Sequence, residues 1–372
     1  MEENFDRERI VDPYSSEIDE EIIKKEALKK KLRFTSDRIG WATVLMIAIW
    51  MGAMFLISMI TAILEYTVGA RLPFSVMDIY NQYLLFFNEI TLALAMAVAL
   101  LFLLSVPKAD MEKRAFEFPV FLKTLLMCFG VGYLGNLIGT VFLGVWNAIT
   151  GNSVGGELEA MLYGVNPMVM FLSVVILAPL LEELFFRKLL IDRLRPFGKT
   201  VSILLPAFLF ALFHQNASQI IYAFTIGAVL AYFYYEKGKY WPCVAIHALF
   251  NWVSGFIPMQ FLPKLEGFSA ELDRIMNRIS GTEELEELAA QVLPLLETYG
   301  VSLALYVVYA LLLFAVNITG VVVFFISLGK FFKNKEKNAL GFSETVKIVM
   351  LNPGMISVTV VLAGLTIFSL FV

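Results

Sequence analysis

Residues 172–190 read LSVVILAPLLEELFFRKLL, an apolar segment that carries two adjacent carboxylates, Glu182 and Glu183, and a cation, Arg187. A segment of about 20 apolar residues is long enough to cross the hydrocarbon core of a bilayer as a helix. Ionised groups are costly at that depth, and those that do occur in membrane helices usually serve a function. The segment therefore predicts a membrane-embedded helix with a functional site on it.

The composition of the whole chain is that of a membrane protein. Of the 372 residues, 59% are hydrophobic and only 17% are charged, unlike an average soluble domain. The formal net charge is −4 and there is no basic stripe, so we expect no nucleic-acid partner. Cys128 and Cys243 lie in apolar segments, which predicts packing positions rather than a disulfide or a zinc motif.

Nine apolar segments are candidates for membrane spans. They predict an all-α fold, a polytopic transmembrane helical bundle of about eight or nine spans. The count depends most on the segments with the shortest connections, between 200 and 258. The nine candidates are 41–66, 83–106, 121–146, 167–195, 200–216, 218–235, 240–258, 301–329 and 349–372.

Five parts of the chain follow from these spans. A polar and basic N-terminal segment, 1–40, lacks the apolar core of a signal peptide, so we expect no cleavage there. Three spans follow within 41–166, and a core that contains the charged spans covers 167–258. An amphipathic, extracytoplasmic loop occupies 259–300, and two further spans make up 301–372.

Lys and Arg gather at the membrane edges of alternate connections, and positively charged loops tend to remain cytoplasmic. The loop 147–166, by contrast, has neither Lys nor Arg. We therefore predict an N-terminus in the cytoplasm and a C-terminus outside. The segments placed inside are 1–40, 107–120, the turn near 195–200, 236–239 and 330–348.

Gly130, Gly132 and Gly135 satisfy the GxGxxG spacing of dinucleotide-binding loops. That motif is informative only between a strand and a helix, and here it lies inside a predicted span. We interpret Gly135 and Gly139 instead as a small-xxx-small face for close helix packing.

The chain has only two histidines, and both fall in predicted spans. At about 1.5 Å per helical residue, Glu182, His214 and His247 lie about 20, 21 and 12 Å from the cytoplasmic ends of their helices. We therefore expect the three side chains at broadly similar depths. Glu89 and Asn88 lie near the outer end of the second span and are expected to reach the interface.

Helical spacing distinguishes the two adjacent glutamates. Glu183 and Arg187 are four positions apart and can neutralise each other, which lowers the cost of burying either charge. Glu182 points about 100° away around the helix and is left without that partner. This position favours a role for Glu182 as general base or acid.

The two histidines complete a constellation typical of hydrolases. His247 and Asn251 are four apart on one helical face, where both can donate hydrogen bonds to a developing oxyanion. His214 can act with Glu182 to position and deprotonate a water molecule.

These residues resemble the CPBP intramembrane protease family, also called Abi, which includes the type II CaaX prenyl endopeptidases and bacteriocin-processing proteins. The family pattern of EExxxR, FxxxH and HxxxN on successive spans is matched in order, over about 168–257. The matching residues are Glu182, Glu183, Arg187, Phe210, His214, His247 and Asn251.

The resemblance implies an enzyme, an intramembrane endopeptidase whose catalytic core is 167–258. It implies that Glu182 and His214 activate water and that His247 and Asn251 stabilise the oxyanion. Glu183 and Arg187 would then support the site. The expected partners are a peptide or membrane-protein substrate and the lipid bilayer, and the expected location is a prokaryotic plasma membrane.

The sequence leaves the cofactor and two other functions open. Glu182, His214 and His247 could supply three zinc ligands, but there is no HExxH motif, and we favour activation of water without a cofactor. A proton-coupled transporter would also use buried ionisable groups, although no internal repeat supports it. A catalytically silent scaffold or immunity protein would retain the same motifs.

Overall fold

The computed structural model describes residues 13–371 apart from 152–153, 156–161, 163, 279–284 and 334–339. The described residues form helices and their connections, with no strand, which confirms the all-α fold class. Several predicted segments extend partly beyond the described residues. These segments are 1–40, 147–166, 259–300 and 330–348.

Three long helices form the N-terminal part of the chain: α1 (Pro13–Val68), α2 (Val76–Leu103) and α3 (Phe118–Thr150). A short 3-10 turn, η1 (Gly69–Arg71), follows α1. Because α1 begins at Pro13, the described part of the polar N-terminal segment is helical and continuous with the first span.

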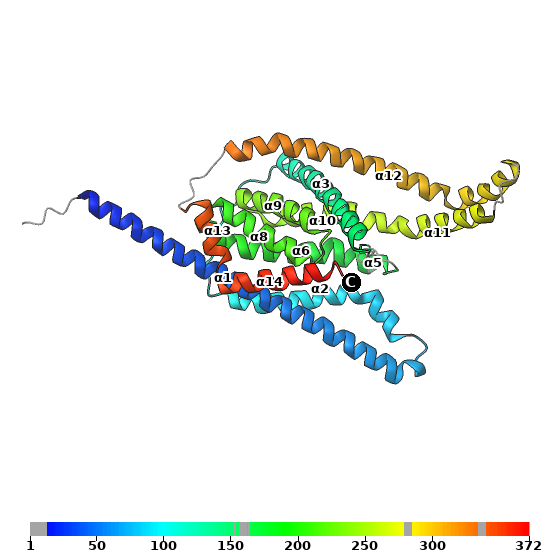
Figure 1. Ribbon diagram of the computed structural model, residues 1–372, viewed down its shortest axis with the longest axis horizontal. Coiled ribbons are helices and arrows are strands. Elements are labelled where there is room, and N and C mark those ends of the chain that lie inside the picture. Colours follow the sequence, from blue (N-terminus) through cyan, green and yellow to red (C-terminus); the bar gives the residue numbers. More distant parts are fainter. Residues whose placement is uncertain are drawn as a thin grey trace, which may run out of the picture.

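The span that carries Glu182, Glu183 and Arg187, called the charged span below, is one continuous helix over 167–197 whose pitch changes along its length. After it, the chain turns back through a bundle of shorter helices at the centre of the molecule (Figure 1). The charged span consists of α5 (Pro167–Met170), the π-helix η2 (Phe171–Leu177), α6 (Ala178–Glu183), the π-helix η3 (Leu184–Leu189), α7 (Leu190–Leu194) and the 3-10 turn η4 (Arg195–Phe197). The bundle helices are α8 (Lys199–Phe213), α9 (Ile220–Lys237), α10 (Tyr240–Asn251) and the π-helix η5 (Trp252–Phe256).

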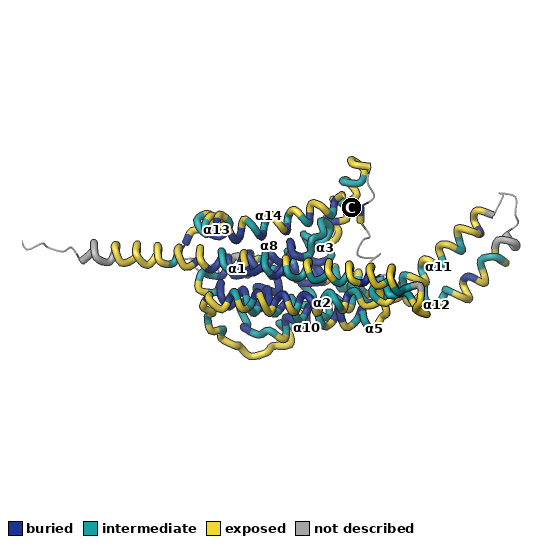
Figure 2. The backbone as a smooth tube through the Cα atoms, turned by 90° about the horizontal axis from the view of Figure 1, so that it is seen from below, coloured by how far each residue is buried: buried dark blue, intermediate teal, exposed yellow. Residues whose placement is uncertain are grey.

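Four helices complete the chain: α11 (Ile257–Arg278), α12 (Leu285–Lys333), α13 (Phe342–Met350) and α14 (Pro353–Phe368). α11 and α12 project together beyond one end of the bundle, so the predicted loop 259–300 is helical where it is described (Figure 1). The outlying ends of α1 and α11 are mostly exposed, whereas buried residues concentrate in the centre (Figure 2).

Six helices in the described part of the chain are long and apolar enough to cross a membrane, or seven if α13 and α14 together form one span. A polytopic helical bundle is therefore confirmed. The candidates 200–216 and 218–235 correspond to shorter helices, α8 with 15 residues and α9 with 18. The count of eight or nine spans stays a prediction.

The last predicted span, 349–372, corresponds mainly to α14, and α13 precedes it at an angle. α13 and α14 are bent by 78° at the break between them. Proline is tolerated in the first turn of a helix but not in its interior, and Pro353 begins α14. The Asn352 side chain caps that first turn by accepting a hydrogen bond from the Met355 N–H at 2.9 Å.

Close contacts of α3 confirm the packing interpretation of its glycines. A Cβ atom at Gly135 would lie 2.5 Å from the Tyr222 Cα, and one at Gly139 would lie 2.3 Å from the Ser218 carbonyl oxygen. Side chains at these positions would push away α9 and the turn that precedes it. The GxGxxG spacing is therefore a helix-packing feature.

Basic side chains tie helix ends together. The Arg193 guanidinium donates to the Leu103 carbonyl oxygen at 3.2 Å, which joins the charged span to the end of α2. Lys199 at the start of α8 pairs with Glu236 near the end of α9 at 2.6 Å. Helix ends that are predicted to lie on the cytoplasmic side are thus in contact with each other. The orientation itself stays a prediction.

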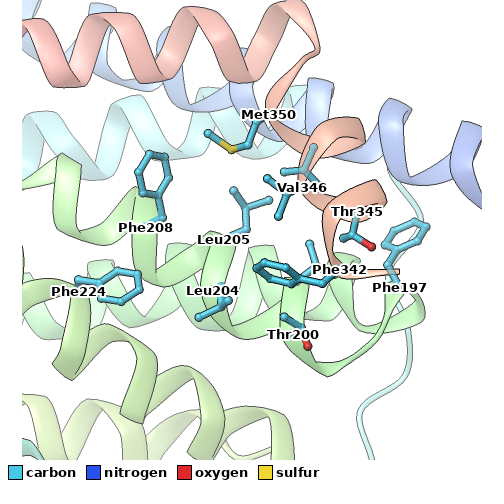
Figure 3. A pocket seen from close by; sticks show the side chains of 12 residues that line it. Phe197, Thr200, Leu204, Leu205, Phe208, Phe224, Phe342, Thr345, Val346 and Met350 are labelled. Atoms are coloured by element: carbon cyan, nitrogen blue, oxygen red, sulfur yellow. The ribbon is translucent and has the colours of Figure 1, made fainter. Parts of the chain in front are cut away.

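An apolar cavity of about 230 Å³ lies between α8, α9 and α13 (Figure 3). Aromatic and aliphatic side chains form nearly all of its wall, and no ionisable side chain lines it. It contains none of the predicted site residues. The lining residues are Phe197, Thr200, Val201, Leu204, Leu205, Phe208, Phe224, Phe342, Thr345, Val346, Val349 and Met350.

Candidate active site

The two glutamates lie on α6, a short α-helical stretch between two π-helical stretches. π-helical turns are rare and occur frequently at functional sites. Pro179 accounts for the first of them, because proline has no N–H to donate within a helix. The Ala178 N–H bonds to the Ser173 carbonyl, five positions back, so the helix widens just before Glu182.

This change of pitch leaves the Val174 carbonyl without a backbone donor. Its donor in an α-helix would be the Ala178 N–H, which Ser173 occupies, and its donor in a π-helix would be Pro179, which has no N–H. The Asn251 side-chain amide donates to this carbonyl at 3.0 Å. Asn251 therefore has a structural partner that the sequence did not predict, and keeps one further amide proton.

Glu183 is the centre of a buried network of charged groups. Its Oε2 atom lies 3.0 Å from the Arg187 Nε, and neither side chain has any exposed surface. Its Oε1 atom lies 3.0 Å from the His247 Nδ1. The structure places the expected i,i+4 pair together and adds a link from α6 to α10. Two partners offset much of the cost of burying this carboxylate.

Phe210 separates and orients the basic groups of the site. The Arg187 guanidinium carbon lies 4.8 Å from the centre of the Phe210 ring, a cation–π contact. The same ring packs edge-to-face on His214 and His247, with centroid distances of 4.8 and 5.9 Å. The aromatic position of the FxxxH motif thus has a physical role as a spacer between three cationic or imidazole groups.

Glu182 differs from its neighbour in both exposure and partners. Its side chain retains 15% of its surface, and its Oε2 lies 3.7 Å from the His247 Nε2. No Lys or Arg forms an ion pair with it in the part of the chain that the structure describes. The site therefore contains one carboxylate held on both sides and one that remains accessible.

His214 lies at the end of α8, immediately after its last residue, Phe213. Its Nδ1 is 2.8 Å from the Phe210 carbonyl oxygen, so its Nε2 is left for the site. Gln215 adopts the left-handed conformation, with φ +52°, and ends the helix there. The Phe210 ring packs against both His214 and His247, and Glu182 lies beside His247, so the three motifs share one region.

Glu89 is a buried carboxyl group on α2. The sequence predicts that it reaches the interface, and that prediction is wrong: only 7% of Glu89 is exposed. α2 begins at Val76, earlier than the predicted start at 83, so Glu89 lies near the middle of the helix. α2 packs against η2 and α6, the part of the charged span that carries Glu182. No spacing within α2 signals the burial of Glu89, because it depends on how α2 packs against these neighbours.

A zinc ion would need three ligands arranged around a common point. Within the described ranges, no group of three or more His, Cys, Asp or Glu side chains is arranged to hold a metal ion. The Nδ1 atoms of His247 and His214 contact Glu183 and a backbone carbonyl, which leaves the Nε2 atom of each ring as the one that could bind a metal. The activation of water without a cofactor therefore stays a prediction.

A helical bundle with several apolar spans and a buried ionisable site defines an integral membrane protein. Residues 164–253, which carry all the motif residues, match the family described as type II CAAX prenyl endopeptidase, Rce1-like. The chain is thus related to the CaaX protease family, through less than half of its length. This relation supports an intramembrane peptidase. No curated protein and no solved structure matches the chain.

The different surroundings of the two glutamates predict different responses to the same substitution. Glu183→Gln leaves the Arg187 charge buried without a counter-charge, so we expect the free energy of unfolding to fall by about 3–5 kcal/mol. Glu182→Gln removes no Lys or Arg partner, so we expect a change within about 1 kcal/mol. Denaturation of the two purified variants in detergent measures this difference, and equal losses would contradict the division of roles.

The Val174 carbonyl predicts a coupling between Asn251 and Pro179. Asn251→Ala leaves that carbonyl without a donor, which should cost about 1–2 kcal/mol of unfolding free energy. In a Pro179→Ala background the restored N–H can bond to the carbonyl, so the cost of Asn251→Ala should fall. A double-mutant cycle measures the coupling. A cycle with Pro206→Ala, a proline inside α8, should be additive.

Proposed function

We propose that this protein is an intramembrane endopeptidase that hydrolyses a peptide bond at or near the membrane. The observation that carries the proposal is the difference in burial and partners between Glu182 and Glu183. Glu183 is fully buried and occupied by Arg187 and His247, whereas Glu182 retains exposed surface beside the His247 Nε2. A general base must be accessible to water and substrate, and of the two only Glu182 meets that condition.

In the proposed reaction, Glu182 and His214 activate the attacking water. A proton on the His214 Nδ1 donates to the Phe210 carbonyl, which leaves the Nε2 lone pair to accept a hydrogen bond from water. Glu182 takes the proton as the water oxygen bonds to the carbonyl carbon of the substrate. When the C–N bond breaks, the same proton passes from Glu182 to the leaving amine.

His247 and Asn251 stabilise the charge that develops on the substrate oxygen. The Glu183 carboxylate is a hydrogen-bond acceptor, which supports a proton on the His247 Nδ1; donation from Nε2 to the oxyanion requires a second proton on the ring. The second amide proton of Asn251 is available because the first is donated to Val174. Glu183 and Arg187 do not meet the substrate; they hold His247 in place.

We further propose a peptide or membrane-protein substrate in the bilayer, a prokaryotic plasma membrane as the location, and a cytoplasmic N-terminus. The relation to CaaX proteases supports a substrate presented at the membrane. The joining of basic helix ends supports the orientation.

Removal of either water-activating group should abolish turnover. Glu182→Ala and His214→Ala should each lower peptide release by about 10²–10⁴-fold, the usual contribution of a general base. Mass spectrometry of membrane-associated peptides, compared between cells with the unaltered chain and with each variant, identifies the products. Glu271→Ala, at an exposed ion pair on α11, is the control that should retain activity.

Wild-type cleavage by either site variant would contradict the proposed activity. If ion flux into proteoliposomes depended on Glu182 while no peptide was cleaved, the transporter hypothesis would replace it. If both site variants complemented a deletion in cells fully, the protein would be a scaffold.

Activation of water without a metal predicts that chelation leaves the enzyme active. The purified protein should contain much less than one zinc per chain, and cleavage should persist after treatment with a strong chelator. Elemental analysis and the peptide assay on the same sample provide the check. Stoichiometric zinc whose removal stops cleavage would make Glu182, His214 and His247 ligands instead.

A further inference from the structure

The apolar cavity between α8, α9 and α13 shares no residue with the proposed active site, and it opens to the outside of the bundle. Three of its lining side chains, Leu204, Phe342 and Val346, are exposed. Its volume of about 230 Å³ is larger than the volume of about 150 Å³ at which a dry, apolar cavity binds benzene. The cavity therefore has room for part of a hydrocarbon chain.

The cavity follows α8 and differs in polarity between its two ends. Its lining residues Thr200 and Phe208 are eight positions apart, which corresponds to about 12 Å along the helix. The two threonines of its wall, Thr200 and Thr345, lie in the first turns of α8 and α13. The rings of Phe208 and Phe224 line the opposite end (Figure 3). A hydrocarbon chain with a polar group at one end fits this direction.

The sequence of α13 explains why one wall of the cavity is apolar. α13 is amphipathic, and the residues that it contributes to the cavity recur at the three- and four-residue spacing of one helical face. The opposite face carries the polar side chains of Ser343, Glu344 and Lys347. A short amphipathic helix of this kind is typical of a membrane interface. The lining residues from α13 are Phe342, Thr345, Val346, Val349 and Met350.

A second hollow adjoins the polar end of the cavity, because Phe342 lines both. Glu344 in this hollow pairs with two lysines of α1, Lys29 at 2.6 Å and Lys25 at 3.6 Å. Lys347 is exposed and forms no ion pair among the described residues. Three lysines around one carboxylate leave an excess of positive charge. This cationic hollow is lined by Lys29, Gly341, Phe342, Ser343, Glu344, Lys347 and Ile348.

The cavity and the cationic hollow together favour one class of occupant. A small anion without a chain would not fill the cavity, and a neutral hydrocarbon would make no use of Lys29 and Lys347. An anionic phospholipid supplies both parts, and lysines near a membrane surface attract such lipids. A zwitterionic phospholipid has the same chains but no net charge to match the lysines.

We propose that the cavity and the cationic hollow bind one anionic phospholipid, with an acyl chain between α8 and α13 and the phosphate at Lys29 and Lys347. The bound lipid holds α13 against α8, and the pair between Lys29 and Glu344 adds α1 to the same assembly. The lipid thus connects the family-matched segment, which contains α8, to helices outside it. This site does not depend on the proposed peptidase activity.

The purified protein in a neutral detergent tests the preference for a charged lipid. Phosphatidylglycerol should raise the unfolding temperature as its concentration increases, because a ligand of the folded chain stabilises it. Phosphatidylcholine with the same chains should bind at least about fivefold more weakly, and glycerol 3-phosphate, which has no chain, should have no effect. Native mass spectrometry should find one phosphatidylglycerol per chain. Equal binding of phosphatidylcholine, or stabilisation by glycerol 3-phosphate, would overturn the proposal.

Two variants separate the headgroup from the chain. Lys347→Gln should weaken the binding of phosphatidylglycerol about fivefold, whereas Lys123→Gln, the same change at an exposed position near the start of α3, should change it less than about twofold. Leu204→Trp fills the cavity, and because each buried methylene contributes about fourfold in affinity, binding should weaken by more than about 10-fold. Leu311→Trp, exposed on α12, is the matched control. A site variant that binds as tightly as its control would overturn the proposal.

Photolabelling of the unaltered protein locates the chain without any substitution. A phosphatidylglycerol that carries a diazirine in one acyl chain should label α8 and α13 at residues such as Leu205, Phe208 and Val349, and excess unlabelled phosphatidylglycerol should prevent this. Mass spectrometry of the peptides identifies the labelled positions. Labelling of the exposed helix α12 to the same extent would overturn the proposal. Because no peptide is cleaved in this experiment, its result is independent of the proposed function.

Discussion

The structure of the site depends on one constraint, the burial of the Glu183 carboxylate between Arg187 and His247. A charge without exposed surface has to be neutralised by groups that approach it closely. Arg187 comes from the same helix, and His247 comes from α10, so this requirement fixes α10 against the charged span. Because both oxygens of Glu183 lie against these partners, Glu183 is not available to react with a substrate. The neighbouring Glu182, one position along the helix, is thereby left as the accessible carboxylate.

The helical distortions around this network serve the same arrangement. A proline in the charged span removes one backbone donor, and the widened turn that results presents a carbonyl to Asn251. The helix that carries the glutamates and the helix that carries His247 and Asn251 are thus joined twice, once by the contact between Glu183 and His247 and once by the Asn251 amide. Together the two contacts fix both the rotation and the height of α10 relative to α6. Phe210 then keeps the imidazoles and the guanidinium apart.

Much of this arrangement follows from local spacing. The Glu183–Arg187 pair and the common face of His247 and Asn251 depend only on helical periodicity, so the sequence predicts both. The contact between Glu183 and His247 depends on how two helices are rotated against each other, and no periodicity within either helix determines that. The burial of Glu89 was missed for the same reason. The number of spans was hard to predict because α8 and α9 are close to the minimum length for crossing a bilayer.

The largest apolar cluster among the described residues connects the family-matched segment to the rest of the chain. It joins Phe185, Phe186 and Phe210 near the site to residues of α1, α2 and α14, from both extremes of the chain. The segment that resembles known proteases is consequently not a module that can be excised and expressed alone. Its inner aromatic surface would be stripped of the neighbours it packs against, and lipid or detergent would have to take their place.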